Sequence, residues 1–507
     1  MAPTLRTISE VNEFLFSFEK MNLGKTDVQL DKNTLSNAQN IVLTSLAPET
    51  RPGFTRVSAT SGTTTGILNQ FVWTDETSTT KWLRTYGPYL QNYSGGYFSN
   101  ILSTLTSGLY GTFAYHPITN YTYFSNGVDN VIAYVSGSHY ESLSSLKKGQ
   151  VYEHFEGRLF AGVNNVLWYT DDNTDRFGDS NYGILEGYIR AIRSQYNKLI
   201  IWTDNGKIYT LYNFDYSQGA AGPEAVYTLA SNIQCLSEKS VKMGPDGLIY
   251  FLGRDETHKA GLFVTDGQSV QPVANSEDAG VFFDNCGAAQ LSKAAAGFRG
   301  NEYWLSVSDA SGAHNNIGII YDTRTKVFIS KVTNLWASDF VSFKTSGRWE
   351  TYFGHSLSGV TLKINGDVAY DETSAGTRLP IESFAVTGAI PLATIGQESR
   401  INKVFLMADA TDSNVKLDFG IADGVGDAWY NRQVTMQQGG QIWGASSVWG
   451  SSASTWGATT RRIQEWVRPP SAIRKARFHK FRFYMNEAEK FKIYGIRTVA
   501  RQVNPLR

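Results

Sequence analysis

Apolar and polar residues alternate with a period of two along most of the chain, which is typical of strands with one buried face. Between about residue 60 and residue 372, short apolar runs are separated by turns rich in glycine and asparagine. The segment 154–213 contains two predicted hairpins, 158–170 and 199–212, and the second turns at Asn205-Gly206. Asn-Gly favours a type I′ hairpin turn, because both central residues of that turn need positive φ. The pattern predicts one hairpin followed by a second of the same shape.

The predicted strands recur at a regular spacing. Strands of similar character start near seven residues that lie between 36 and 54 residues apart: Val72, Tyr123, Leu159, Leu199, Ile249, Tyr303 and Tyr352. A propeller blade is a four-stranded unit that repeats about every 40–50 residues, and loop insertions lengthen the period. We therefore predict an all-β fold with a six- or seven-bladed β-propeller over residues 57–372.

The two ends of the chain differ from this central part. Residues 1–56 are predicted to form a short N-terminal arm and a first strand. Within them Ile8, Val11 and Leu15 have helical spacing, whereas Phe14 and Phe16 fit an extended arm equally well, so both structures stay open. After a linker at Asp371–Gly376 the alternation resumes, which predicts a C-terminal β-sandwich over residues 377–507.

Composition narrows the function classes. Aromatic residues make up 13% of the chain and there are 47 glycines, which favours strands and tight turns. Lys+Arg and Asp+Glu number 46 each, so no overall charge points to nucleic acid or to a membrane surface. Cys235 and Cys286 are the two cysteines, and two buried thiols are expected in place of a disulfide framework. The sequence predicts neither a signal peptide nor a membrane segment, so we expect synthesis in a reducing compartment.

A low-complexity segment, QIWGASSVWGSSASTWGATT, interrupts the predicted sandwich. Its serines and glycines cannot build a core, so we expect a surface loop. The loop places Trp443, Trp449 and Trp456 where no local core can take them. We predict that these tryptophans pack against another subunit or another protein.

The last part of the chain is basic, with 13 Lys and Arg residues against three acidic residues between Arg461 and Arg507. Arg474, Lys475 and Arg477 begin a run in which cations alternate partly with aromatic residues as far as Arg482. This cationic face fits contact with phosphate or with an acidic neighbouring subunit. A solvated strand face, balanced by acidic residues elsewhere, fits the pattern equally well.

No motif for catalysis or for a cofactor is found. Asp171, Asn173, Asp175 and Asp179 have the oxygen spacing of a calcium loop, but Arg176 stands where such a loop needs glycine. The seven histidines are scattered without zinc-type spacing, and no hydrolase nucleophile or phosphate-binding loop occurs. Two carboxylate pairs, Glu153 with Glu156 and Asp278 with Asp284, are interpreted as surface charges. We expect no catalytic residue, no metal and no cofactor.

Several phrases, in their order along the chain, resemble phage tail β-propeller proteins. The segment from Asn22 to Ile41 contains Ala38-Gln39-Asn40 and is followed by Arg51-Pro52-Gly53. The phrase at 157–160 and the later ones at 169–177, 266–273 and 321–328 are also similar to that family. The family includes the tail nozzle, or packaged-DNA stabilisation, proteins of short-tailed phages. The resemblance covers most of residues 22–370 and extends to the Trp-Gly-rich C-terminal part, whereas residues 1–21 match nothing in it.

The resemblance implies a structural virion protein without catalytic residues. Such a protein is a ring-forming tail component, a hexameric nozzle or hub, assembled in the host cytoplasm and located in the tail. Its partners are further copies of itself, adjacent tail or adaptor proteins, and the genomic DNA that passes through the conduit. Two other functions are considered: a receptor- or glycan-binding tail protein that uses the Trp-Gly loop for stacking, and a propeller glycosidase.

Overall fold

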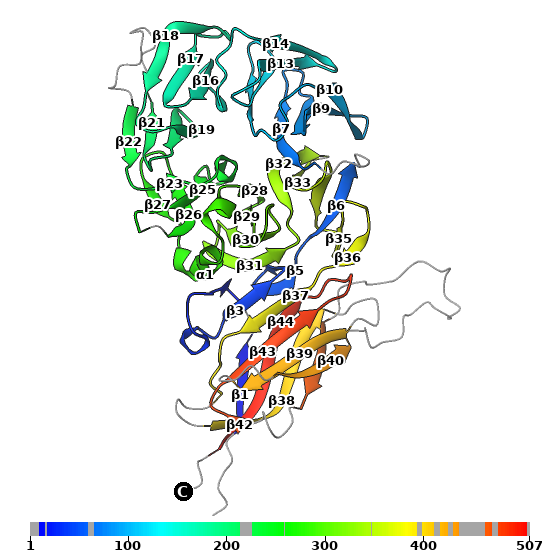
Figure 1. The fold of residues 1–507 in the computed structure, drawn as a ribbon. Helices are drawn as coiled ribbons and strands as arrows, with labels where there is room; N and C mark the ends of the chain where they lie inside the picture. The colour runs from blue at the N-terminus through cyan, green and yellow to red at the C-terminus, as the bar shows by residue number, and fades with distance from the viewer. Residues whose placement is uncertain are drawn as a thin grey trace, which may run out of the picture.

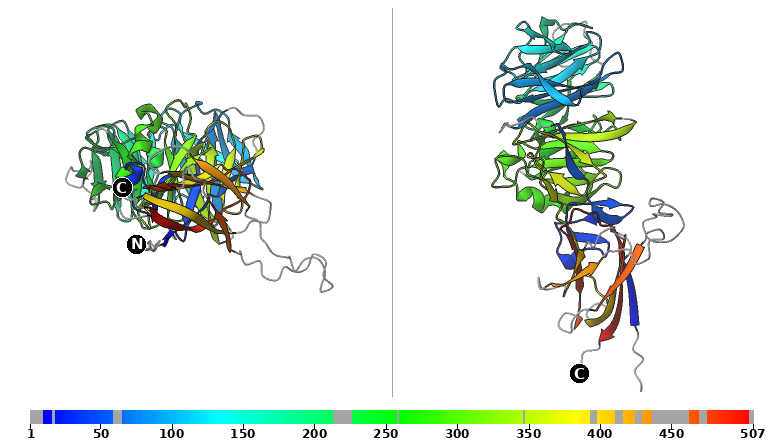
Figure 2. Two further views of the ribbon diagram at one scale, coloured as in Figure 1. Left: turned by 90° about the horizontal axis from the view of Figure 1, so that it is seen from below. Right: turned by 90° about the vertical axis from the view of Figure 1, so that its right-hand side faces the viewer.

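The computed structural model describes residues 10–15, 18–58, 65–212, 226–257, 259–345, 347–392, 398–409, 416–423, 429–435, 462–468 and 475–503. The molecule is elongated, with a ring of sheets at one end and the strands of both chain termini at the other (Figures 1 and 2). Its helices are short: α1 spans Gly280–Asp284, α2 spans Ala288–Leu291, and 3-10 turns lie at Asp27–Gln29, Glu238–Ser240 (η4) and Ser276–Ala279. In the described ranges, no helix is long and apolar enough to cross a membrane.

Six blades of the ring are each built from one continuous segment. Blade 1 contains β7 (Ile67–Thr74), β8 (Thr80–Tyr86), β9 (Tyr89–Ser94) and β10 (Tyr97–Leu102), and blade 2 contains β11 (Thr112–His116), β12 (Tyr121–Ser125), β13 (Val131–Ser136) and β14 (His139–Leu143). Blade 3 contains β15 (Val151–Phe155), β16 (Arg158–Val163), β17 (Val166–Thr170) and β18 (Phe177–Ile184), and blade 4 contains β19 (Ile189–Gln195), β20 (Lys198–Thr203), β21 (Ile208–Leu211) and β22 (Val226–Ala230). Blade 5 contains β23 (Gln234–Cys235), β24 (Lys242–Met243), β25 (Ile249–Arg254), β26 (Ala260–Thr265) and β27 (Val270–Pro272), and blade 6 contains β28 (Ala295–Arg299), β29 (Glu302–Val307), β30 (Ile317–Asp322) and β31 (Val327–Thr333).

A further sheet, the closing blade, completes the ring between blade 6 and blade 1. It contains β32 (Ala337–Thr345), β33 (Arg348–His355), β34 (Thr361–Asn365) and, from the other end of the chain, β6 (Gly53–Ser58), and it continues into β35 (Tyr370–Glu372) and β36 (Arg378–Pro380). Strand β32 lies against both β28 and β7. The closing blade thus covers the faces that blade 6 and blade 1 would otherwise leave exposed at the seam of the ring. The predicted β-propeller of six or seven blades is confirmed.

The predicted boundary at residues 56–57 is wrong in one respect, because it falls inside β6. The N-terminal segment is also no free arm. Strand β1 (Glu10–Leu15) pairs with β44 (Ile493–Val503), and β3 (Thr34–Gln39) pairs with β37 (Ser383–Thr387) and with β31 of blade 6. Of the two structures left open for this segment, the extended one is observed at β1. Strands β2 (Lys20–Met21), β4 (Ile41–Thr44) and β5 (Ala47–Thr50) complete it.

The C-terminal part contributes two sheets. One has the order β1-β44-β38-β41, and the other continues from blade 6 through β3 to β37, β43, β39 and β40. Their strands are β38 (Glu398–Asp409), β39 (Lys416–Asp423), β40 (Tyr430–Thr435), β41 (Arg462–Val467), β42 (Lys475–Ala476) and β43 (His479–Met485). The prediction that residues 377–507 form a C-terminal sandwich needs a correction. These residues do not form the two sheets by themselves, because β1 belongs to the first sheet and β3 to the second.

The burial pattern explains why two kinds of strand occur. Along β38 buried and partly exposed residues alternate, because one face packs inward and the other is partly exposed. In blade 5, Ile249–Gly253 is buried on both faces, because each blade packs against a neighbour on either side. One apolar cluster contains both Tyr303 of blade 6 and Phe483 of β43, so propeller and C-terminal sheets share a core. Cys235 and Cys286 are free and buried, as predicted.

Candidate functional site

Innermost strands of the propeller carry β-bulges close to their first residue. In β7 the pairing skips Leu68, and in β32 it skips Ser338. A bulge inserts one residue without a ladder partner, which leaves its backbone groups available for other contacts. Both bulge carbonyls accept hydrogen bonds from one ammonium group, that of Lys239, and the Nζ–O distance to Ser338 is 3.2 Å. Lys239 therefore spans the axis from blade 5 to the seam between the closing blade and blade 1.

The turn η4, which carries Lys239, is held by buried hydroxyl groups. Ser240 donates to the carbonyl of Ser237 at 2.6 Å and accepts the backbone N–H of Leu252 at 3.0 Å. The Tyr303 hydroxyl donates to the carbonyl of Ser240 at 2.6 Å. These bonds fix the short turn against blades 5 and 6. The side chains of Glu238 and Lys239 are thereby aimed at the axis.

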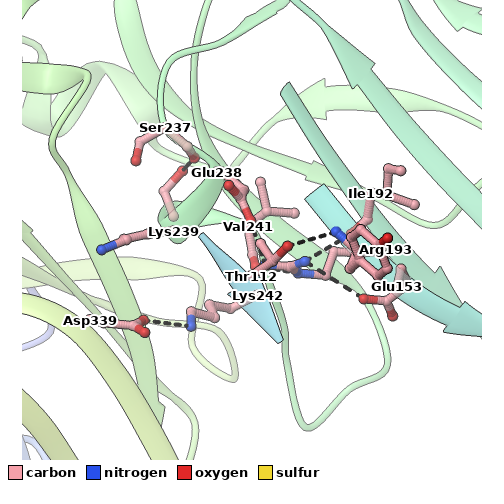
Figure 3. A network of polar contacts seen from close by, with 12 residues as sticks. Thr112, Glu153, Ile192, Arg193, Ser237, Glu238, Lys239, Val241, Lys242 and Asp339 are labelled. Atoms are coloured by element: carbon pink, nitrogen blue, oxygen red, sulfur yellow. Dashed lines mark hydrogen bonds and ion pairs between the residues drawn. The ribbon is translucent and has the colours of Figure 1, made fainter. Parts of the chain in front are cut away.

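Six charged side chains line the axial cavity, which has a volume of about 330 Å³ (Figure 3). They are three carboxylates and three cations: Glu153, Glu238, Asp339, Arg193, Lys239 and Lys242. Arg193 lies 3.7 Å from both Glu153 and Glu238. Lys242 lies 3.3 Å from Asp339. The lining charges balance, and the ion pairs connect blade 3, blade 4, blade 5 and the closing blade.

Hydrogen bonds satisfy the carboxylates further. The backbone N–H and the hydroxyl of Ser194 donate to Glu153 at 3.1 and 2.7 Å. The backbone N–H of Gln70 donates to Asp339 at 2.7 Å. Each of these two carboxylates thus has both a cation and N–H or O–H donors as partners, which is how buried charges are retained in proteins.

Burial changes the pKa values of this cluster. It raises the pKa of the Glu238 carboxyl to about 7, although Arg193 acts in the opposite direction. It lowers the pKa of the Lys239 ammonium to about 8, although Asp339 and Glu238 oppose the change. Burial also raises the pKa of Glu153. The cause is common to all three, since loss of solvent disfavours the charged form.

A second cavity, the entrance cavity, lies at the end of the ring where the innermost strands begin. It has a volume of about 690 Å³ and meets the axial cavity at Glu238 and Lys239, which line both. The starts of β15 and β19 line it, at Val151 and Ile189, together with the segment 234–237. The ring of Tyr110 lies over the Lys239 ammonium, with 3.9 Å from Nζ to the ring centroid.

A third polar cluster, the junction cluster, joins the propeller to the C-terminal sheets. Its centre is Arg51, whose side chain is fully buried. All five guanidinium N–H groups have acceptors: the amide oxygen of Asn40, both carboxylate oxygens of Asp371, and the carbonyls of Pro52 and Thr333. The Cζ atom of Arg51 also lies 4.2 Å from the centroid of the Phe54 ring. A planar guanidinium has five N–H donors in fixed directions and can bind all five acceptors at once, whereas an ammonium has only three donors.

The amide of Asn40 completes the junction cluster. Its nitrogen donates to the Thr333 hydroxyl at 2.6 Å and to the carbonyl of Glu382 at 2.8 Å. Its oxygen accepts from Arg51 and from the backbone N–H of Thr333, both at 2.9 Å. Asn40 has a φ of 55°, a conformation that asparagine adopts more readily than most residues. The two motifs that carried the family resemblance, Ala38-Gln39-Asn40 and Arg51-Pro52-Gly53, therefore meet in space.

The predicted interface residues are only partly described by the structure. Trp443, Trp449, Trp456 and Arg474 lie outside the described residues. Lys475 lies in β42, where its backbone pairs with that of Arg400 in β38. Arg477 is exposed. Their role in an interface stays a prediction.

Two later cations of the same basic run have partners within the chain. Lys480 forms an ion pair with Asp27. The guanidinium of Arg482 lies 4.9 Å from the ring centroid of Trp429 and donates to Asn431 at 2.9 Å. Lys480 and Arg482 are therefore engaged by the chain's own residues.

The two carboxylate pairs suggested by the sequence are not surface pairs. Glu153 lines the axial cavity, while Glu156 lies in a hairpin turn with a φ of 48°. Asp278 is buried and accepts from Lys20 at 2.7 Å and from the amide of Asn22, whereas Asp284 is exposed. The interpretation as surface charges is thus wrong for Glu153 and Asp278, because each neutralises a cation inside the fold.

The suggested calcium loop is an ordinary turn in the structure. Asp171 accepts from the Asn181 amide at 2.7 Å, and Asp175 accepts from the Tyr123 hydroxyl at 3.1 Å. Across the described part of the chain, no group of three or more His, Cys, Asp and Glu side chains is arranged to hold a metal.

Sequence reasoning missed a contact between the buried His116 and the half-buried His154, which join blades 2 and 3. The rings of His116 and His154 lie with centroids 5.0 Å apart in an edge-to-face arrangement. Burial lowers the pKa of His154 to about 4 and that of His116 in the same direction. His116 lies in β11 and His154 in β15, the first strands of two successive blades, and these equivalent places were the signal in the sequence that pointed to a contact.

Comparison with known proteins identifies no family. No family model matches the chain, and no curated protein matches it. Among solved structures, "YCF48 bound to D1 peptide" is similar over 63% of this chain and 100% of that one, with 9% identity and a TM-score of 0.37. The computationally designed Ika8 protein is similar over 61% of this chain and 99% of that one, with 10% identity and a TM-score of 0.37. The extracellular domain of the putative hybrid two-component system BT4673 from B. thetaiotaomicron is similar over 77% of this chain and 48% of that one, with 14% identity and a TM-score of 0.40.

Proposed function

We propose that this chain is a structural virion protein, a ring-forming component of a phage tail conduit through which the genome passes. The proposal begins from the ordered phrases that resemble phage tail β-propeller proteins. The observation that supports it best is the junction cluster. Asn40 and Arg51, from the two leading motifs, bind each other and join the propeller to the C-terminal sheets. Both side chains are buried and present no reactive group.

A structural role suits this arrangement. Blade 6 and the C-terminal strands share one sheet through β3, and the buried ion pair of Arg51 and Asp371 lies beside that connection. A shared sheet and a shared apolar core oppose hinge motion between the two ends of the molecule. A subunit of a closed ring needs two different contact surfaces in a fixed relation, and a rigid two-ended molecule provides them.

The proposed genome path runs between subunits and not along the propeller axis. Lys239 spans that axis, and the other five charged side chains that line the axial cavity are held in ion pairs. The chain's balanced charge agrees with a passage that does not hold DNA, because each Lys or Arg paired with phosphate strengthens binding. The proposed partners are further copies of the chain, adjacent tail or adaptor proteins, and DNA in transit; the proposed location is the virion tail.

The first test is the assembly state of the purified full-length chain. Light scattering after size exclusion, followed by negative-stain electron microscopy, should give closed rings of one size. Antibody labelling of virions should place the chain in the tail. A stable monomer that binds glycans or cleaves a glycoside would contradict the proposal and favour one of the two other functions considered.

A further inference from the structure

The entrance cavity has a strongly uneven charge. Its lining contains four cations, Arg190, Lys239, Arg254 and Lys293, against one carboxylate, that of Glu238. Glu238 and Lys239 already belong to the axial network. The remaining three cations therefore face the cavity without an acidic counterpart in its lining, in a chain whose total charge is balanced.

The two arginines are not used by the fold. Within the part of the chain that the structure describes, neither Arg190 nor Arg254 has an ion pair or a side-chain hydrogen bond. The Nε of Arg254 is buried and has no acceptor. Lys293 is exposed and donates to the carbonyl of Ala313 at 2.8 Å.

The position of Arg190 results from a third bulge in an innermost strand. The pairing of β19 with β20 passes from Ile189–Thr203 to Ala191–Trp202, which leaves Arg190 as the extra residue. A bulge redirects the side chain that it carries. Its side chain is exposed at the cavity, whereas its neighbours Ile189 and Ala191 are buried.

The rest of the lining favours a peptide over nucleic acid. Leu109, Val128 and Leu236 give the cavity apolar surface, and Val128 is exposed by 55%. Gln150 and Gln234 add amides, which can both donate to and accept from a peptide backbone. Sites that follow a nucleic-acid backbone combine cations with several aromatic rings on which bases stack. In the described lining of this cavity Tyr110 is the one aromatic residue, and its ring already lies over the Lys239 ammonium.

We propose that the entrance cavity binds an acidic peptide segment of a partner protein, with Arg190 and Arg254 as its carboxylate-binding residues. A guanidinium binds a carboxylate through two parallel N–H donors, and Arg190, whose side chain is exposed, presents its guanidinium in the lining of the cavity beside Arg254. The aliphatic side chains of the cavity would contact apolar residues between the acidic ones. This proposal stands on the cavity alone and does not depend on the role in a phage tail.

The test uses the full-length chain and a fluorescein-labelled hexapeptide of alternating glutamate and leucine, with binding followed by fluorescence anisotropy. We expect binding that weakens at least about tenfold in R190E and in R254Q, since a charge-assisted bond lost from a binding site has an effect of that size. R324E is the matched control, because Arg324 is exposed and lies outside the cavity lining. Its binding should equal that of the unmodified chain.

Melting curves verify that each variant is folded. If R254Q does not fold, K293E takes its place as the companion of R190E. The same peptide with lysine in place of glutamate should not bind. The proposal is overturned if the glutamate peptide does not bind, if both peptides bind equally, or if R190E and its companion variant bind like the control. Tighter binding of a labelled oligothymidine that displaces the peptide would also overturn it, in favour of nucleic acid.

Discussion

Arg51 and Asp371 form a buried, bidentate ion pair with N–O distances of 2.9 and 2.6 Å. The two residues lie 320 positions apart in the sequence. Arg51 precedes β6, the outer strand of the closing blade, and Asp371 lies in β35, which pairs with β6. The pair therefore fastens the beginning of the propeller to its end. It does so beside the strands that lead into the C-terminal sheets.

Replacing Arg51 by methionine should strongly destabilise the protein. The variant leaves the carboxylate of Asp371 buried without its cation, and breaking a buried pair from one side costs about 3–5 kcal/mol. Urea unfolding followed by circular dichroism measures the loss. R378M is the control, because Arg378 forms an exposed pair with Glu372 at 3.5 Å on the adjacent strand. That pair should contribute less than about 1 kcal/mol. If R51M and R378M lose the same free energy of unfolding, the buried pair stabilises the protein no more than the exposed one.

Replacing Gly53 by alanine should also destabilise the junction. A Cβ at this position would lie 2.1 Å from the carbonyl oxygen of Tyr370, a backbone atom that cannot move aside without shifting β35. We expect a loss of about 1–3 kcal/mol, the usual range for overpacking. G261A is the control, because a Cβ at Gly261 meets no atom within 4 Å. An unfolding midpoint of G53A equal to that of G261A would refute the steric argument.

Local sequence pattern predicted the blades well and their connections poorly. Alternating apolar runs located both strands of the hairpin β20–β21 to within a residue or so. The type I′ turn expected at Asn205-Gly206 is absent, because only Gly206 has positive φ there. That geometry occurs instead at Glu156-Gly157, between β15 and β16, where both residues have positive φ.

Contacts between distant residues were beyond the reach of the pattern. The sequence around Arg51 does not predict an ion pair with Asp371, because that pair forms only when the propeller ring closes. The same holds for β3, which joins blade 6 to the C-terminal strands, and for the bulges at Leu68 and Ser338 that receive Lys239. Strand periodicity determines which face is buried, whereas closure, bulges and ion pairs follow from tertiary structure.

The histidine pair should make the propeller sensitive to acid. Burial holds the pKa of His154 at about 4, below its ordinary value of 6.5, and His116 shifts in the same direction. A base with a lowered pKa in the folded state contributes stability that is present above pH 6.5 and is lost as the pH falls through the folded value. Asp175 is the acidic group that opposes this shift at His116.

H154Q should therefore lose less stability than the unmodified chain between pH 6.5 and pH 4. Glutamine keeps a polar side chain that does not gain a proton in this range. Urea unfolding at pH 7 and at pH 4.5 gives the comparison, and H139Q is the control because His139 is exposed. If H154Q and H139Q show the same dependence on pH, the pair does not control acid stability.

The three tryptophans of the Trp-Gly segment should be needed for assembly. We expect the triple variant W443A/W449A/W456A to remain a folded monomer, because the segment has too many serines and glycines to belong to a core. Aromatic residues at interface centres commonly contribute about 2 kcal/mol or more each, so ring formation should fall sharply. Light scattering measures the oligomer and circular dichroism the fold. Unchanged particle yield would count decisively against this role.

The basic run should act in protein contacts and not along a DNA passage. Strong binding of phosphate would hold the genome during ejection, so the cations of a conduit protein are better placed at interfaces. Two later members of the run already follow this pattern within the chain, since Lys480 pairs with Asp27 and Arg482 lies over Trp429. Arg474, Lys475 and Arg477 precede them, and the exposed Arg477 is available to a neighbour.

Reversing Arg474, Lys475 and Arg477 to glutamate should therefore block assembly while the monomer stays folded. The matched control reverses three exposed cations of the propeller, Arg324, Lys326 and Arg348, which changes the net charge equally. Only the first variant should lose rings in light scattering, because the effect comes from the contact and not from total charge. Particles that assemble with the reversed run but eject DNA at an altered rate would instead place these cations in the passage. That outcome would reverse the argument, since the run would then face phosphate.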